Sequence, residues 1–100
     1  MNIGSALKQA RVGKGINQEL AAELSKTSQT YLSKIETGKL IPSTKMVAKL
    51  CKAYEVPVAI VMFMSVRASD VPKSKRKIFG QLKPHIQNLI DSCGFLSPAK

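Results

Sequence analysis

Apolar residues recur at helical spacing along this chain, and that periodicity is the feature that most restricts its fold. The clearest example is a stripe at positions i, i+1, i+4, i+5 and i+8, formed by Met46, Val47, Leu50, Cys51 and Tyr54. No run that alternates apolar and polar residues, in contrast, is bracketed by residues that form hairpins. The sequence therefore predicts an all-α protein.

Turn and capping residues divide the first two thirds of the chain into five expected helices. Gly13 and Gly15 follow a first apolar stripe and readily adopt the positive backbone angles of a helix stop. Asn17 is suited to cap a short second helix. The apolar side expected for this second helix consists of Leu20, Ala21 and Leu24.

The third expected helix begins at Thr27 or Ser28 and ends at Gly38. Pro42 precedes the fourth helix, and Pro57 suits the first turn of the fifth. The residues expected to face inward from the third helix are Tyr31, Leu32 and Ile35. Together the five helices are expected to form one domain over residues 1–66.

The rest of the chain reads as a connector followed by a helical extension. Residues 67–76, "RASDVPKSKR", are polar and contain a proline, which is typical of a connector. Apolar residues return at helical spacing within residues 77–94, where Gly94 is the expected end. Pro84 is expected to kink this extension or to split it into two short helices, because proline cannot donate a helical hydrogen bond.

The expected fifth helix is apolar around nearly its whole circumference, so one small domain can cover only one of its sides. Either the extension covers the other side or a second copy of the chain does, and a two-fold dimer that uses both is the preferred arrangement. The residues assigned to this packing are Val61, Phe63, Met64, Phe79, Leu82, Ile86, Leu89 and Ile90.

The charge of the chain indicates a polyanionic partner. Sixteen Lys and Arg against six Asp and Glu give a formal net charge of +10. A membrane surface is the competing partner, because the extension is basic and amphipathic. However, the longest apolar run, "VPVAIVMFMSV", is shorter than the roughly 20 residues that a membrane-spanning helix needs. The start of the chain has no run that resembles a signal peptide, so a cytoplasmic protein without a membrane partner is expected.

Enzymatic chemistry finds little support in the sequence. His85 and Cys93 fall on a similar helix face, but Cys93 completes an apolar stripe and His85 has no third group to orient it. Cys51 and Cys93 do not form a metal-spaced pair, and no phosphate-cradling loop appears. We therefore expect no catalytic residue, no metal and no cofactor.

A distinctive stretch, "TSQTYLSKIETGK" at residues 27–39, carries short hydrogen-bonding side chains on the outward face of the third helix. A helix with short side chains can approach base edges in the major groove of DNA closely. The amide of Gln29 matches the N6/N7 edge of adenine, and the ammonium of Lys34 suits the O6/N7 edge of guanine. This stretch predicts a helix that reads DNA.

The same residues carry a resemblance to a known family. Arg11, "GINQE" at 15–19, Ala22, "SQTYLSKIETGK" at 28–39 and Pro42-Ser43 closely resemble the XRE and lambda-repressor-like helix-turn-helix family over roughly residues 3–66. The resemblance implies the five-helix fold of that family. It departs from the family at the turn, where Ser25 replaces an apolar residue and Lys26 replaces a glycine.

The resemblance also implies roles for individual residues. Gln18 would start the first helix of the motif and contact phosphate, residues 28–34 would form the recognition helix, and Arg11 would pair with Glu36 beneath it. Lys26 and Lys39 are expected on phosphate, and Tyr31 is expected to pack inward with its hydroxyl in water. The residues assigned to DNA binding are Asn17, Gln18, Lys26, Thr27, Ser28, Gln29, Thr30, Tyr31, Ser33, Lys34 and Lys39.

These observations favour a dimeric regulator of transcription that binds double-stranded DNA at a two-fold symmetric operator, as a repressor of phage or mobile-element type. Two alternatives stay open. In the first, an antitoxin or restriction-controller regulator binds a protein partner through residues 67–100. In the second, the motif no longer binds DNA, and the basic tail docks on another partner.

Overall fold

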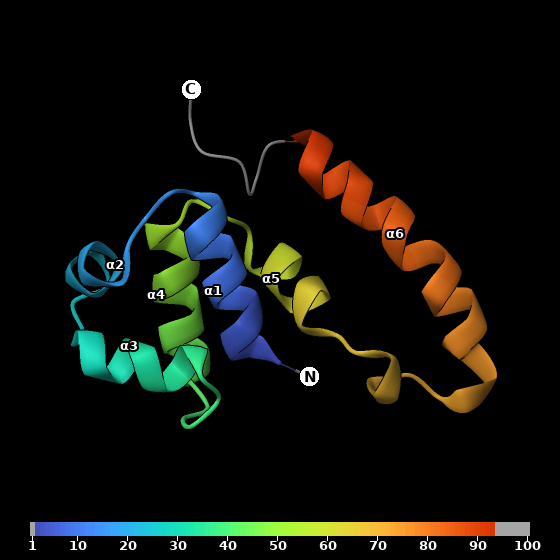
Figure 1. Cartoon of the computed structure of the whole chain (residues 1–100), viewed down its shortest axis with the longest axis horizontal. Helices are drawn as coiled ribbons and strands as arrows, with labels where there is room; N and C mark the ends of the chain where they lie inside the picture. Colours follow the sequence, from blue (N-terminus) through green and yellow to red (C-terminus); the bar gives the residue numbers. More distant parts are fainter. Residues whose placement is uncertain (1, 94–100) are drawn as a thin grey trace.

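The computed structural model describes residues 2–93, and every regular element within them is helical (Figure 1). The five-helix body is followed by two short 3₁₀ turns and a long final helix, α6. The elements are α1 (Ile3–Gly13), α2 (Gln18–Leu24), α3 (Gln29–Glu36), α4 (Thr44–Ala53), α5 (Val58–Ser65), η1 (Ala68–Asp70), η2 (Lys73–Lys75) and α6 (Arg76–Cys93). The all-α prediction is confirmed.

Side-chain caps define where the first four helices begin. The side chains of Asn2, Asn17, Ser28 and Ser43 each accept a hydrogen bond from the backbone N–H three residues later, at distances of 2.8–3.1 Å. Each such cap typically contributes about 1 kcal/mol to helix stability. The third helix is therefore capped by Ser28, one of the two residues that the sequence offered.

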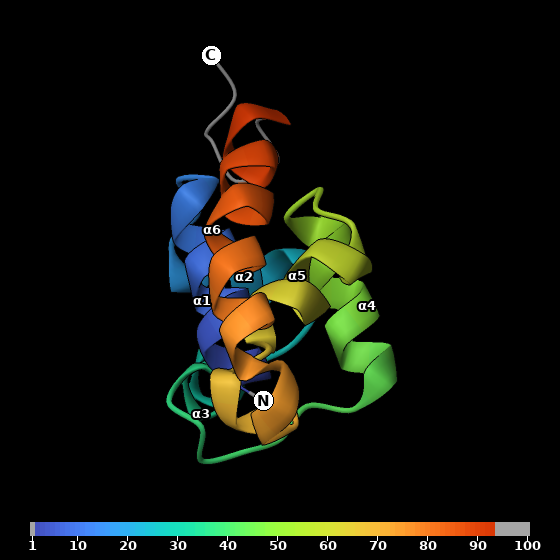
Figure 2. The same cartoon turned by 90° about the vertical axis from the view of Figure 1, so that its right-hand side faces the viewer.

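The core lies where α1, α3, α4 and α5 meet. Figure 2 shows α5 seated between α1 and α4, and residues of both helices contact it. Small residues allow close packing: Gly4 of α1 lies directly against the backbone carbonyl of Ile35 in α3. The largest side chains that are almost fully buried in this core belong to Leu7, Leu32, Ile35, Leu50, Tyr54 and Val61.

The prediction for the buried side of α2 is wrong for its two leucines. Leu20 and Leu24 are 43% and 51% exposed, whereas Ala21 and Ala22 are buried. The helix contacts both α3 and α4, and it does so through its alanines. A small side chain permits a close approach between helices, so the leucines are left on the outer face.

Helix α6 is continuous through Pro84, so the predicted split into two helices is wrong. Proline removes the hydrogen bond that the carbonyl of Gly80 would accept. Both Gly80 and Pro84 are exposed, so water can hydrogen-bond that carbonyl and the helix can continue.

Of the two ways considered for covering α5, cover by the extension of the same chain is wrong for most of the apolar face of α6. Figure 1 shows α6 as an arm that stands away from the five-helix body. Phe79 is half-buried and Ile90 is buried. Four other apolar side chains of this helix are exposed by 38–65%: Ile78, Leu82, Ile86 and Leu89.

Polar contacts with the connector explain this placement of α6. The guanidinium of Arg76 donates to the carbonyls of Ala68 and Val71, both at 3.0 Å. The ammonium of Lys83 donates to the carbonyl of Val66 at 3.0 Å and lies 5.5 Å from the centre of the Phe79 ring. The bonds of Arg76 hold α6 against the connector, and the bond of Lys83 ties it to Val66, the residue that follows α5. On α5 itself, Val61 belongs to the core of its own domain, while Phe63 and Met64 are half-buried.

Candidate nucleic-acid interface

The turn between α2 and α3 accommodates both unusual residues. The buried hydroxyl of Ser25 donates to the carbonyl of Ala21 at 2.7 Å, so its polar group has a partner. Lys26 has a backbone φ of 56°, in the left-handed region that glycine adopts without a steric penalty. The N–H of Thr27 then donates to the carbonyl of Ala22 at 2.9 Å and closes the turn. The usual turn geometry is therefore reached at the cost of some backbone strain, about 1–2 kcal/mol for a residue other than glycine.

The outward face of α3 borders a shallow polar hollow of about 400 Å³. Four of its lining residues lie on α3, one starts α2 and one follows α3. They are Gln18, Gln29, Thr30, Ser33, Lys34 and Lys39. The structure thus brings six of the predicted DNA-binding residues onto one surface.

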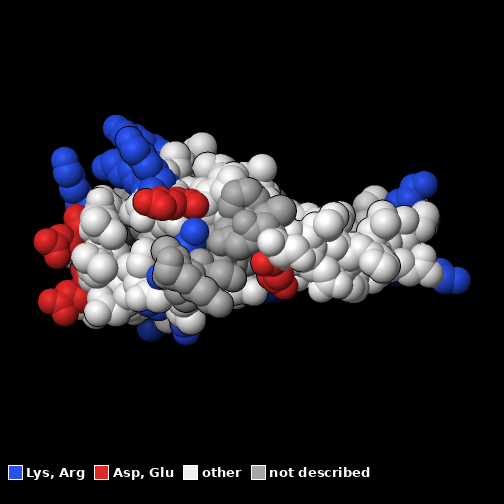
Figure 3. Space-filling view, turned by 90° about the horizontal axis from the view of Figure 1, so that it is seen from above, with Lys and Arg blue, Asp and Glu red and all other residues white. Residues whose placement is uncertain are grey.

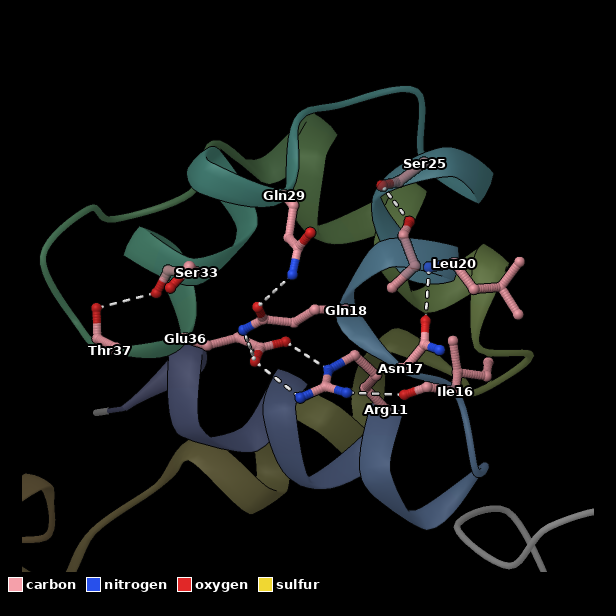
Figure 4. Close-up of polar contacts among 11 residues, drawn as sticks. Arg11, Ile16, Asn17, Gln18, Leu20, Ser25, Gln29, Ser33, Glu36 and Thr37 are labelled. Atoms are coloured by element: carbon pink, nitrogen blue, oxygen red, sulfur yellow. Dashed lines mark hydrogen bonds and ion pairs between the residues drawn. The ribbon is translucent and has the colours of Figure 1, made fainter.

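A chain of hydrogen bonds connects this surface to the interior (Figure 4). The guanidinium of Arg11 donates to Glu36 through Nε at 2.8 Å and through Nη2 at 3.1 Å. The same carboxylate accepts from the amide of Gln18 at 3.0 Å, and Gln18 in turn accepts from the amide of Gln29 at 3.5 Å. The side chain of Gln29 is thereby linked, through a long contact with Gln18, to the buried pair of Arg11 and Glu36.

The ion pair at the base of this chain is buried. Arg11 and Glu36 are each 8% exposed. The remaining guanidinium nitrogen of Arg11, Nη1, donates to the carbonyl of Ile16 at 2.8 Å. Bidentate pairing in a dry site is stronger and less screened by salt than pairing at the surface. Burial, followed by the nearby charge of Glu36, raises the pKa of Tyr54, so its phenol stays neutral beside the pair.

Other predicted residues serve the local structure or lie outside the hollow. The side-chain oxygens of Asn17 and Ser28 are engaged in capping α2 and α3. Tyr31 is half-buried against the core, and Thr27 is half-buried in the turn. Lys26 is exposed and lines a different groove, between α2 and α4. The contact of Gln29 with Gln18 was not predicted, although the amides of both residues were available as a signal.

The described residues hold no cluster suited to a metal ion, and none of their helices is long and apolar enough to cross a membrane. Burial raises the pKa of the Cys51 thiol, which disfavours the reactive thiolate. His85 is exposed on α6, and the side chain of Cys93 lies outside the described residues. No nucleophile activated by a base is present in the part of the chain that can be described.

Comparison with known proteins supports the interpretation of the motif. The clp gene regulator ClgR from C. glutamicum, in its crystal structure, has 32% sequence identity and a TM-score of 0.64, covering 72% of this chain and 91% of that one. The transcriptional regulator ClgR of Mycobacterium tuberculosis, from strains CDC 1551 and H37Rv, is 30% identical over 60 residues, or 60% of this chain and 54% of the relative. The chain thus matches about half the length of these curated relatives.

The motif itself is matched over more than half of the chain. A family model described as "Helix-turn-helix" covers residues 7–61, which extend from within α1 to within α5 and include the whole polar hollow. The resemblance seen in the sequence is thereby confirmed, and the chain belongs to the helix-turn-helix family.

Proposed function

We propose that this protein is a cytoplasmic regulator of transcription that binds double-stranded DNA sequence-specifically through α3. The observation that carries the proposal is the polar hollow on α3, in which Gln29 is linked through Gln18 to the buried ion pair. The relatives of known structure or sequence are described as gene or transcriptional regulators, which agrees with it. The family is not enzymatic, and the chain is accordingly no enzyme.

The side chains around the hollow suit base readout in the major groove. Thr30 and Ser33 are short, so the helix can approach the base edges beside Gln29 and Lys34. The net charge of +10 attracts the phosphate backbone and supplies affinity that does not depend on sequence. Specificity would then come from the few groups that α3 presents.

Replacing Gln29 with Ala is expected to weaken binding to the preferred sequence by about 1–3 kcal/mol and to relax the preference at one base pair. The physical reason is the loss of an amide that can pair with the N6/N7 edge of adenine and that contacts Gln18 in the free protein. Fluorescence anisotropy with the preferred duplex and its single-base variants measures both effects. Equal weakening on every sequence would show instead that Gln29 contacts only the backbone.

Replacing Lys39 with Ala should weaken binding to all duplexes alike and reduce the slope of log K against log salt by about 1. Lys39 is exposed beside the hollow, in the turn that follows α3, where a phosphate is expected. Lys8→Ala is a matched control, because Lys8 is equally exposed on α1 but does not border the hollow. A slope that changes equally in both variants would rule out a local phosphate contact at Lys39.

We further propose that the protein acts as a homodimer and represses by occupying a two-fold symmetric operator. Support comes from the exposed apolar face of α6 and from the half-buried side chains Phe63 and Met64 on α5. Contiguous apolar surface of this kind marks an interface. In such a dimer, the two α3 helices would lie about 34 Å apart and read successive turns of the major groove.

Charge placed on the apolar face of α6 should abolish the dimer. The double variant Leu82→Glu/Ile86→Glu is expected to sediment as a monomer and to lose most of its operator affinity, because each half-site then binds alone. The control Gln81→Glu/Asn88→Glu adds the same charge on the opposite face of the helix, at residues that are also exposed. A fully dimeric Leu82→Glu/Ile86→Glu variant would exclude this face as the interface.

The same apolar face supports one alternative. In an antitoxin or a restriction-controller regulator, residues 67–100 would bind a protein partner instead of a second copy. In that case the purified chain would be a monomer and would form a stoichiometric complex with its partner. The variant Leu82→Glu/Ile86→Glu would disrupt this complex but would leave binding to a DNA half-site unchanged. Analytical ultracentrifugation of the purified chain separates the two arrangements.

A further inference from the structure

A second groove lies outside the polar hollow on α3, and Lys26, which was expected to contact phosphate, is one of its lining residues. It has a volume of about 440 Å³ and lies between the end of α2 and the C-terminal half of α4. It shares no lining residue with the polar hollow on α3. The residues that line it are Leu24, Ser25, Lys26, Lys49, Lys52 and Ala53.

The groove combines positive charge with apolar surface. Lys26, Lys49 and Lys52 are all exposed, and their flexible side chains can present three ammonium groups to a ligand. Leu24, which also lines the groove, is 51% exposed, although a leucine gains about 1.5–3 kcal/mol when it is fully buried. Figure 3 shows Lys and Arg side chains gathered over one corner of the five-helix body. A ligand that complements this groove must supply both negative charge and apolar surface.

We propose that this groove is a docking site for an acidic peptide segment of a protein partner, a segment that carries one large apolar side chain among its carboxylates. The carboxylates would pair with the three lysines, and the apolar side chain would cover Leu24 and Ala53. DNA fits less well, because a phosphate backbone would neutralise the lysines but leave Leu24 in water. The groove and the hollow on α3 have no lining residue in common, so a peptide in the groove would leave the residues of the hollow uncovered.

The test uses the full chain and a defined probe: a fluorescent twelve-residue peptide of Asp and Glu with a single central Phe. A second peptide, with Ala in place of Phe, reports the apolar contribution. Lys49→Gln/Lys52→Gln is expected to weaken the Phe peptide about tenfold, since two charge pairs are lost. The matched control Lys8→Gln/Lys77→Gln removes the same charge from exposed residues elsewhere, and is expected to change affinity less than about twofold.

The leucine provides an independent variant. Leu24→Ala is expected to weaken the Phe peptide about fivefold and to leave the Ala peptide unchanged, because only the apolar contact is removed. Leu24 is outside the core, so the variant should unfold at the same temperature as the parent chain. Unchanged operator affinity in the Lys49→Gln/Lys52→Gln chain would show that the groove acts separately from DNA binding.

Several results would overturn the proposal. Equal binding of the Phe and Ala peptides, or equal losses in the groove variant and its control, would reduce the interaction to net charge. Weaker binding of duplex DNA by Lys49→Gln/Lys52→Gln than by the control Lys8→Gln/Lys77→Gln would assign the groove to phosphate. Weaker binding to phosphatidylglycerol vesicles, with the peptides unaffected, would assign it to a membrane surface. None of these outcomes bears on base readout by Gln29, so this proposal and the proposed function can fail independently.

Discussion

Replacing Glu36 with Ala should lower the free energy of unfolding by about 3–5 kcal/mol, because the guanidinium of Arg11 would remain buried without its counter-charge. Arg11 keeps only its bond to the carbonyl of Ile16 in that variant. Gln18 also loses its acceptor, so the link from Gln29 to the buried pair should be lost and DNA affinity should fall with stability. Urea denaturation followed by circular dichroism measures the change in unfolding free energy.

A double-mutant cycle provides the control. The free energy of unfolding lost in the double variant Arg11→Ala/Glu36→Ala should be smaller than the sum of the losses in the two single variants, because no unpaired charge is left inside the protein. The double variant should also be more stable than at least one of the single variants. A buried apolar pair can even replace such an ion pair at little cost. Strictly additive losses would mean that Arg11 and Glu36 do not interact, and would remove the proposed anchor of α3.

Gly4→Ala should destabilise the five-helix body by about 3 kcal/mol or more, at the upper end of what overpacking costs. A methyl group on Gly4 would clash with the backbone carbonyl of Ile35, because Cβ atoms in folded proteins do not come so close to other heavy atoms. Backbone cannot rotate away as a flexible side chain can, so α1 and α3 must separate. The melting temperature should drop, and DNA affinity should drop because α3 is displaced.

A matched glycine on the surface separates this clash from a general effect of alanine. A Cβ on Gly80 in α6 would meet no atom within 4 Å. Gly80→Ala should therefore raise stability by up to about 1 kcal/mol, through the better helix propensity of alanine. If Gly4→Ala changed stability no more than Gly80→Ala does, α1 and α3 could not be in close contact at Gly4.

The fold of the five-helix body was predictable because its signals are local. Asn17 and Ser28 announce helix starts through their capping side chains, and the stripe from Met46 to Tyr54 indicates which face of α4 is buried. The buried side of α2 was not predictable from hydrophobicity alone. In a helix of two turns, the distance between backbones decides whether alanine or leucine faces inward, and that distance depends on α3 and α4.

The direction of α6 depended on tertiary contacts that sequence periodicity does not contain. Its apolar stripe was recognised, but the direction of that stripe also depends on the bonds of Arg76 to two connector carbonyls and of Lys83 to the carbonyl of Val66. Similarly, the motif spacing identified which residues gather around α3, whereas the separation of Lys26 from them appears only in three dimensions. The rule that proline ends a helix failed at Pro84 because the carbonyl it leaves free is exposed.

Sequence-specific recognition by α3 can be tested by selecting bound sites from a pool of random duplex DNA. The purified chain and its Gln29→Ala variant would be taken through the same rounds of binding, washing at increasing salt and sequencing. The parent chain should enrich one motif with two-fold symmetry, and Gln29→Ala should enrich the same motif with a relaxed preference at one base pair in each half-site. Enrichment of no motif by the parent chain, with binding that simply disappears as salt rises, would contradict sequence-specific recognition by α3.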